Sequence, residues 1–181
     1  MRFLIASDIH GDAESAERIS SLYKNGGYDK LLLLGDLLYH GPRNDLPAAY
    51  NPKAVIKILS ELKDEIISVR GNCEAEVDQM VLPFPVLSES AMVFADGKAI
   101  FMTHGHIHTP EKHPGGIDAF LSGHTHIPVL ERKDGIIYLN PGSVSIPKGG
   151  FLPSYAVWEY PEARIISLID GKTIFRLSLE G

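Results

Sequence analysis

Seven polar residues of types that bind metal ions follow short apolar segments of this chain. His124 and His126 stand one residue apart, after the apolar run at 119–121 and Gly123. In an extended segment, residues i and i+2 point the same way, so both imidazoles can serve one place. Four other apolar runs also end in Asp, His or Asn. The full set of candidate ligands is Asp8, His10, Asp36, Asn72, His104, His124 and His126.

This combination of residue types indicates a particular chemistry. Asp, His and Asn without thiolates suit divalent ions of intermediate hardness, such as Mn, Fe, Co, Ni or Zn. Seven candidates exceed the four ligands that a structural zinc site takes. The natural division is two ions about 3.5–4 Å apart, as in two-metal phosphatases and nucleases. A water trapped between them would become hydroxide near neutral pH and attack phosphorus in line. The residues therefore predict a dinuclear hydrolytic centre.

Such a centre needs a sheet that brings the ends of several strands together. Apolar runs at 2–7, 30–34 and 66–69 predict buried strands. Apolar residues at helical spacing predict helices from Ala13 to about Lys24 and from Pro52 onward. A strand, a helix and a parallel strand open an α/β fold, in which the carboxyl ends of the strands face one crevice.

The second half of the chain is predicted to consist mainly of short strands joined by turns. A short helix is predicted at about 74–80, and hairpin dipeptides follow at Asp96-Gly97 and Asp134-Gly135. The predicted strands are 91–95, 98–102, 119–121, 129–131, 136–139, 155–160, 163–169 and 173–179. Parallel α/β structure followed by antiparallel β structure predicts two sheets packed face to face, with helices outside. Because no repeat or linker interrupts the chain, residues 1–181 are expected to form a single domain.

Composition narrows the class of protein. With 44% apolar and 22% charged residues, the chain has the balance of a soluble globular protein. The net charge is −6 and no basic block is present, so no long nucleic acid is expected as a partner. The single cysteine, Cys73, excludes an internal disulfide and fits a reducing compartment. The first apolar run is too short for a signal segment or a membrane span. We expect a cytoplasmic protein without a membrane partner.

The blocks, taken in order, resemble the calcineurin-like metallophosphoesterase superfamily. They are Asp8-x-His10, Gly35-Asp36, Gly71-Asn72, Thr103-His104-Gly105-His106 and Gly123-His124-Thr125-His126. Three further stretches, at 41–44, 70–73 and 140–150, are similar to the small bacterial and archaeal phosphodiesterases of that superfamily. The resemblance implies a four-layer α/β/β/α sandwich of two mixed sheets flanked by helices.

The resemblance also implies how the ligands divide. Asp8, His10 and His126 would hold one ion, and Asn72, His104 and His124 would hold the other, with Asp36 bridging both. Manganese is the expected metal, with Zn, Ni, Fe and Co as alternatives. Asp36, Asn72 and His104 would act in catalysis through the metal-bound hydroxide. In such a scheme the second ring nitrogen of each histidine should meet a carbonyl or a carboxylate.

Cys73 departs from the pattern of the wider superfamily, in which many members carry His after the Asn. That His is thought to protonate the leaving oxygen or to stabilise the phosphoryl charge. A thiol is a poorer general acid and adds no positive charge. Leaving-group assistance then comes from elsewhere, or the activity favours esters with good leaving groups. Alternatively, Cys73 is a small packed side chain without a chemical role.

Four residues are candidates for contact with the substrate. His40, Arg43 and Asn44 follow Asp36 in a turn-rich loop. The guanidinium fork of Arg43 can hold phosphate oxygens, although a solvated loop is the competing interpretation. His106 is the fourth candidate, because it follows His104 by two residues and can line the pocket.

We therefore expect a metal-dependent phosphodiesterase that hydrolyses small or nucleotide-like phosphodiesters. If the protein is an enzyme of another kind, it is a phosphomonoesterase that uses the same dinuclear site. If it is not an enzyme, it is a non-catalytic metal-binding scaffold, because one relative of this fold in the retromer coat acts chiefly as an interaction module. The complete ligand set favours an enzyme, although a metal site alone does not demonstrate turnover. Self-association into a homo-oligomer is compatible with the sequence.

Overall fold

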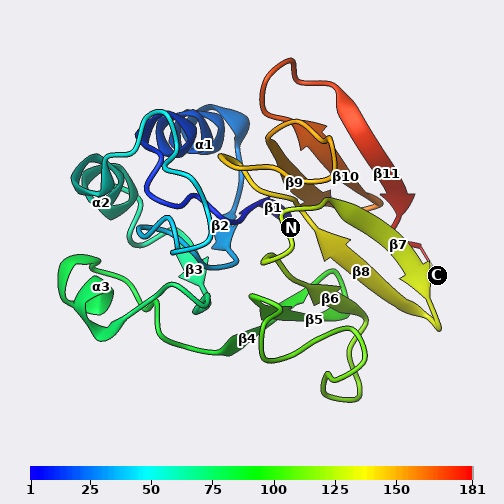
Figure 1. Cartoon of the computed structure of the whole chain (residues 1–181). Coiled ribbons are helices and arrows are strands. Elements are labelled where there is room, and N and C mark those ends of the chain that lie inside the picture. The colour runs from blue at the N-terminus through cyan, green and yellow to red at the C-terminus, as the bar shows by residue number, and fades with distance from the viewer. Residues whose placement is uncertain (181) are drawn as a thin grey trace.

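The computed structural model describes residues 1–180 and contains two mixed β-sheets packed face to face (Figure 1). The strands are β1 (Arg2–Ala6), β2 (Lys30–Leu33), β3 (Ile66–Ser68), β4 (Ser90–Ala95), β5 (Lys98–Thr103), β6 (Ala119–Leu121), β7 (Val129–Lys133), β8 (Ile136–Asn140), β9 (Ser154–Glu159), β10 (Glu162–Ser167) and β11 (Thr173–Ser178). The helices are α1 (Ala13–Gly26), α2 (Pro52–Ser60) and α3 (Glu76–Val81). One sheet has the order β11-β10-β9-β1-β2-β3, and the other has the order β4-β5-β6-β8-β7.

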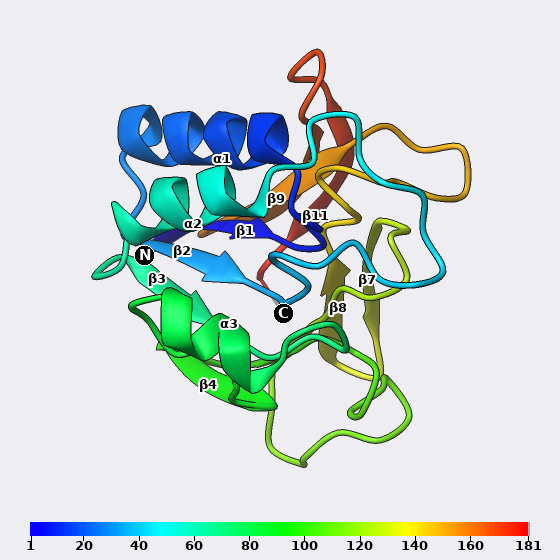
Figure 2. The same cartoon turned by 60° about the vertical axis from the view of Figure 1, so that its left-hand side comes forward.

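The first half of the chain forms the predicted parallel α/β unit. β1 pairs in parallel with β2, and β2 pairs in parallel with β3. Asp12 caps the N-terminus of α1, where its side chain accepts a hydrogen bond from the amide of Ser15 at 2.7 Å, and Gly27, in the left-handed conformation, caps the C-terminus. Asn51 caps α2 in the same way, ahead of Pro52. Both helices lie on one face of the six-stranded sheet (Figure 2).

The second half of the chain contains parallel strand pairs as well as the antiparallel pairs that its hairpin dipeptides predict. β4–β5 and β7–β8 are antiparallel hairpins that turn at Asp96-Gly97 and Asp134-Gly135. However, β5–β6 and β6–β8 are parallel pairs. The long segment 104–118 connects β5 to β6, and a connection of this length allows a crossover to a parallel strand. β9, β10 and β11 are antiparallel, but they extend the first sheet beside β1 instead of completing the second one.

Alternation along β1 shows how the core is divided. Phe3 and Ile5 point between the two sheets, where Trp158 is fully buried. Leu4 and Ala6 point to the other face, which packs against α1 and α2. β1 is therefore covered on both sides, as its apolar run predicts.

The outer face of the five-stranded sheet carries a smaller apolar cluster of Phe101, Ile117 and Phe120. The segment 104–118 packs over it, with His108 against the ring of Phe101 and His113 against that of Phe120. The predicted class, a mixed α/β fold of two mixed sheets with flanking helices, is confirmed. Within residues 1–180, no helix has both the length and the apolar character needed to cross a membrane.

Candidate metal centre

The loops that follow β1, β2, β3, β5 and β6 bring the predicted ligands together. The amide of Asp8 donates to the carbonyl of Gly35 at 3.1 Å, and the amide of His10 donates to that of Asp36 at 2.8 Å. On the other sheet, the amide of Gly123 donates to the carbonyl of His104 at 2.9 Å. Backbone hydrogen bonds therefore join the ligand loops within each sheet, and the loops of one sheet lie opposite those of the other.

Five of the seven predicted ligands have a backbone in the left-handed region. The φ angles are 58° for Asp8, 49° for His10, 57° for Asp36, 67° for His124 and 60° for His126. Such angles are uncommon outside glycine, and Asp and His adopt them more readily than apolar residues. Among residues 1–180, the only other non-glycine residues with a positive φ angle are Asp96 and Asp134, which lie in hairpin turns. Backbone strain is thus concentrated where the chain bends sharply to direct these side chains inward.

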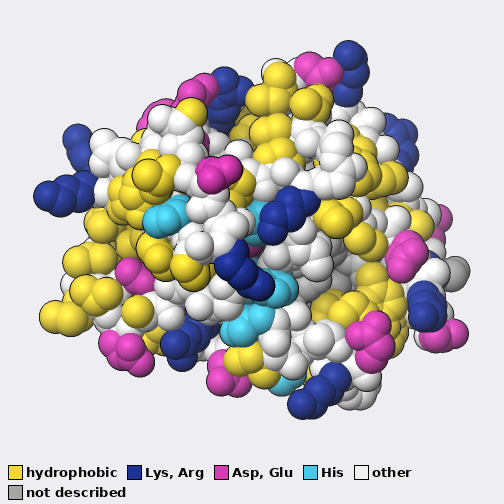
Figure 3. Space-filling view, in the orientation of Figure 1, with side chains coloured by type: hydrophobic (Ala, Val, Ile, Leu, Met, Phe, Trp, Pro, Cys, Tyr) yellow, Lys and Arg dark blue, Asp and Glu magenta, His cyan; other side chains and the backbone are white. Residues whose placement is uncertain are grey.

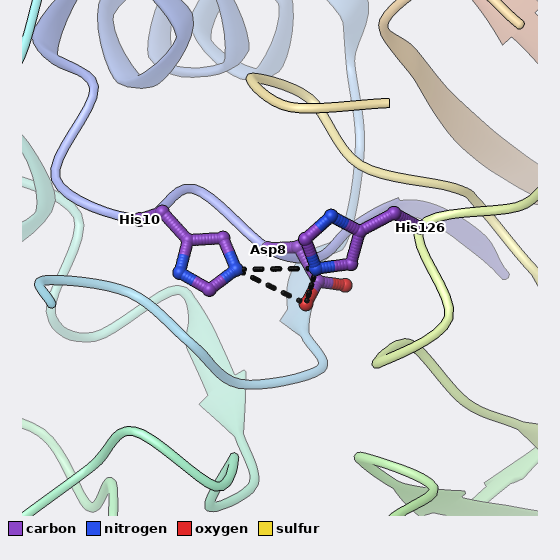
Figure 4. Close-up of side chains that lie close together, drawn as sticks. All are labelled: Asp8, His10 and His126. Carbon is purple, nitrogen blue, oxygen red and sulfur yellow. Dashed lines mark hydrogen bonds and ion pairs between the residues drawn. The ribbon is translucent and has the colours of Figure 1, made fainter. Parts of the chain in front are cut away.

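Asp8, His10 and His126 form the first cluster (Figure 4). Oδ1 of Asp8 lies 3.2 Å from Nε2 of His126 and 3.6 Å from Nε2 of His10. Nδ1 of His10 donates to the carbonyl of Tyr39 at 2.8 Å, and Nδ1 of His126 donates to that of Ile146 at 2.7 Å. Because a carbonyl can only accept, each Nδ1 carries the hydrogen and each Nε2 is turned inward.

His104 leads the second cluster. Its Nδ1 donates to the carbonyl of Leu34 at 2.6 Å. Its Nε2 lies 3.1 Å from Oδ1 of Asn72 and 3.4 Å from Oδ2 of Asp36. That same Asp36 oxygen lies 3.6 Å from Nε2 of His10. Asp36 therefore stands between the two clusters, with His124 beside His104 at a ring separation of 5.1 Å.

The donor set of these clusters fits divalent cations. Oδ1 of Asp8 is fully buried and has no hydrogen-bond donor among residues 1–180, which is costly for a carboxylate oxygen. Nε2 of His10 and Nε2 of His126 face each other at 3.2 Å. Two inward ring nitrogens beside an unpaired carboxylate oxygen are the kinds of ligand atom that a divalent cation binds. The expected carbonyl partner is present for His10, His104 and His126, but no such bond is found for His124 within the described residues.

Electrostatic coupling appears in the pKa values of the metal-free protein. Burial alone would raise the pKa of Asp8, but the adjacent imidazoles of His10 and His126 and the charge on His104 hold it well below its usual range. Burial likewise opposes ionisation of His104, yet Asp36 and Asp8 raise its pKa to about 9. Burial and the charge on His104 lower the pKa of His124. Without metal, a protonated His104 therefore compensates the buried carboxylates.

Glu74 is a buried residue that supports the ligand loops and was not among the residues predicted from the sequence. It is 4% exposed, and its carboxylate accepts hydrogen bonds from the amides of Asp36 at 2.9 Å, Leu37 at 2.6 Å and Gly71. These bonds tie the loop after β2 to the loop after β3. Burial and the charge of Asp36 raise the pKa of Glu74 to about 7, while the three amide donors oppose this rise. In the sequence, Glu74 cannot be distinguished from a solvent-exposed acidic residue in a polar turn. Only its position two residues after Asn72 could have indicated a role.

The loop at 140–150 supports the site from the other side. Oγ of Ser143 and Oγ of Ser145 both donate to the carbonyl of Asp8, at 2.8 and 2.9 Å. Nδ2 of Asn140 donates to the carbonyl of Gly123 at 2.7 Å. The same loop supplies the carbonyl of Ile146 that orients His126. Its role is therefore to hold ligand loops in place.

The predicted substrate contacts separate into two groups. A cavity of about 300 Å³ is lined by Asp36, Arg43, Asn44, Asn72, His124, Thr125, His126 and Lys148. Arg43 and Asn44 thus open onto the ligands, and Lys148 joins them as a residue that the sequence analysis did not single out. Histidine and basic side chains lie next to one another at the centre of this face (Figure 3). The side chain of His40 turns away, with its ring 4.7 Å from that of Tyr39 and 5.4 Å from that of Tyr50.

His106 and Cys73 complete the surroundings of the ligands. The ring of His106 lies 5.3 Å from that of His104 and 6.0 Å from that of His124. Cys73 is half-buried, and its amide donates to Oδ1 of Asp36 at 2.8 Å. Burial and the Asp36 carboxylate raise the pKa of the Cys73 thiol, so it is neutral at physiological pH.

Comparison with known proteins identifies the family. The family model of the calcineurin-like phosphoesterase superfamily domain matches residues 1–163. The chain belongs to this superfamily. It is 42% identical over 181 residues to phosphodiesterase YfcE of Escherichia coli strain K12, with 99% of this chain and 98% of YfcE covered. The solved structure of Escherichia coli YfcE, described as a phosphoesterase, matches with a TM-score of 0.96 over 99% of this chain and 100% of that one.

A more distant relative and a solved structure of low sequence identity are also similar to this chain. The probable metallophosphoesterase YsnB of Bacillus subtilis is 27% identical, with 87% of this chain and 83% of YsnB covered. Vacuolar Protein Sorting 29 of Cryptosporidium parvum matches with a TM-score of 0.68 at 19% identity, over 98% of this chain and 97% of that one, which shows a shared fold. The resemblance noted in the sequence is thereby confirmed.

The position of Glu74 predicts a combined loss of stability and metal affinity in Glu74→Gln. An amide would place a donor against the backbone amides, at a cost of about 1–3 kcal/mol in the free energy of unfolding. Loosening Asp36 should also weaken manganese binding about 10- to 100-fold. Denaturant unfolding and calorimetric titration measure the two effects, with exposed Glu76→Gln as the control. Unchanged manganese affinity in folded Glu74→Gln would contradict a positioning role.

The raised pKa of His104 predicts that metal binding releases protons. At pH 7 this histidine is protonated in the metal-free protein, and only the neutral imidazole can bind metal. Manganese affinity should therefore rise with pH up to about 9, and proton release should decrease above it. Calorimetry in buffers of different ionisation enthalpy measures both quantities. An affinity that does not change between pH 7 and 9 would rule out this coupling.

Proposed function

We propose that this protein is a dinuclear metal-dependent phosphodiesterase acting on small or nucleotide-like phosphodiesters. The observation that carries the proposal is the place of Asp36, whose Oδ2 lies 3.6 Å from Nε2 of His10 and 3.4 Å from Nε2 of His104. One ion would be held by Asp8, His10 and His126, and the other by Asn72, His104 and His124, with Asp36 shared. Two bound ions would supply a water of lowered pKa and neutralise charge on the phosphoryl oxygens.

The side chains around the ligands bind and orient the ester. Arg43 and Lys148 line the same cavity as Asp36 and Asn72, where their positive charges hold the anionic substrate. Asn44 is kept in place by a hydrogen bond from its Nδ2 to the carbonyl of His40 at 2.8 Å. His40 acts through that carbonyl and not through its ring.

His106 is the best-placed residue to assist the leaving group. Burial and the charge on His104 lower its pKa, so it is neutral near pH 7. Its Nδ1 is buried without a hydrogen-bond partner among residues 1–180. A neutral imidazole beside the ligands can stabilise a leaving oxygen by hydrogen bonding. The neutral thiol of Cys73 does not supply the positive charge that His contributes in other members.

The comparisons favour a diesterase over a scaffold. YfcE, at 42% identity over nearly its whole length, carries the name phosphodiesterase. All seven expected ligand positions are occupied by metal-binding residue types. The shared interior of the two sheets supports one domain over residues 1–181. Four points stay predictions: that manganese is the native metal, that the protein is cytoplasmic, that it has no long nucleic acid partner, and that it self-associates.

The proposed function predicts that Asp36→Ala and Asn72→Ala lower kcat/KM at least about 100-fold, because each change removes a ligand. The substrate is bis(4-nitrophenyl) phosphate with added manganese, and exposed Asp64→Ala is the control. 4-Nitrophenyl phosphate, assayed in parallel, should be hydrolysed more slowly than the diester. Full activity of Asp36→Ala would refute the dinuclear assignment, and faster monoester hydrolysis would favour a phosphomonoesterase.

A further inference from the structure

A second cavity lies next to the metal centre. It has a volume of about 480 Å³ and is lined in part by Tyr39, Pro42, Cys73 and Ala75. It shares Arg43, Asn44 and Asn72 with the smaller cavity that contains the ligands. A group bonded to a phosphate at the metal centre can therefore extend past Asn72 into this space. Its volume falls within the range of small-molecule sites, about 300–1,000 Å³.

The size of Cys73 leaves this space open. A Cβ atom added at Gly41 would lie 3.2 Å from Sγ of Cys73 and 3.3 Å from Nδ2 of Asn44, so the loop after β2 packs closely on the thiol. An imidazole at position 73 is larger than the thiol and would occupy part of the cavity. Glu74 also lines it, but its carboxylate is engaged by three backbone amides. The wall on this side is therefore compact, and the one carboxylate in it is bonded to the backbone.

The remaining walls suit a flat ring. Tyr39 lines the cavity and is 43% exposed, so it offers surface to a ligand although its ring also packs against that of His40 at 4.7 Å. Arg43 is exposed at the junction of the two cavities, where a guanidinium can stack on an aromatic face. Pro42 and Ala75 add apolar surface without a charge.

A competing cavity lies on the outer face of the five-stranded sheet. It has a volume of about 300 Å³, it is lined by Phe120, Val129 and Tyr138 among others, and it touches the metal-site cavity only at Thr125. Glu111, Glu131 and Lys133 also line it. Two carboxylates against one ammonium leave a net negative charge, which disfavours the approach of an anionic phosphoester. The cavity beside Cys73 carries a cation at its junction and is the better extension of the site.

We propose that the cavity lined by Tyr39, Arg43, Cys73 and Ala75 is a subsite for a planar, uncharged aromatic substituent of the phosphoester. This inference rests on the proposed function and deepens it, because it names the class of ester. The preferred substrates are phosphodiesters in which at least one arm carries an aromatic ring. Specificity for this arm resides in Tyr39 and Ala75, which do not belong to the ligand set.

Binding of two phosphonates to the manganese-loaded protein tests the subsite without turnover. Phenylphosphonate and methylphosphonate share the anionic group and differ in the arm. Calorimetry should show phenylphosphonate binding at least tenfold more tightly to the wild type. Ala75→Phe fills the cavity and should reduce this preference to threefold or less. Tyr39→Ala removes one wall and should reduce it as well, which gives a second variant should Ala75→Phe fail to fold. Val129→Phe, which fills the outer cavity, should leave the preference intact.

Two results would overturn the inference. One is equal affinity of the wild type for both phosphonates. The other is a preference for phenylphosphonate that survives in Ala75→Phe and Tyr39→Ala or is lost in Val129→Phe. Either pattern would place the phenyl ring outside the cavity beside Cys73. Hydrolysis of bis(4-nitrophenyl) phosphate is measured on the same samples. A phenyl preference that depends on Tyr39 and Ala75, together with no hydrolysis of any ester, would refute the proposed function and still support the aromatic subsite.

Discussion

Two buried carboxylates, Asp8 and Asp36, impose the main electrostatic constraint on this structure. Both are almost inaccessible to solvent, and they meet the same inward-facing histidine nitrogens. Ionised carboxylates in such a place require positive charge, which a proton on His104 supplies in the metal-free protein. Divalent ions would supply it more fully and would satisfy the unpaired oxygen of Asp8. The chemistry of the site thus follows from the burial of its acids.

Holding this arrangement requires support from outside the ligand set. Backbone carbonyls fix the tautomers of three histidines, Glu74 joins the loops after β2 and β3, and Ser143 with Ser145 secures the loop after β1. The left-handed backbone of most ligands is a local cost that these contacts and the packed sheets sustain. A preorganised centre of this kind binds metal without rebuilding its loops.

Much of this site could be predicted from the sequence, for a physical reason. Apolar runs mark buried strands, and strand ends in an α/β sheet converge, so the polar residues after each run had to meet. The return of β9–β11 to the first sheet and the parallel placement of β6 could not be predicted, because pairing partners depend on contacts distant in sequence. Glu74 was missed and the ring of His40 misplaced, since burial of a loop side chain follows from tertiary packing and not from its neighbours in the chain.

Asp36 is proposed to join two metal ions into one reaction centre. A crystal structure of the manganese-loaded protein, with anomalous scattering recorded at the manganese edge, tests this role. We expect two anomalous peaks about 3.5–4 Å apart, each in contact with the Asp36 carboxylate. One peak should lie beside Asp8, His10 and His126, and the other beside Asn72, His104 and His124. A single peak, or an Asp36 carboxylate bound to one ion only, would contradict a bridging role for Asp36.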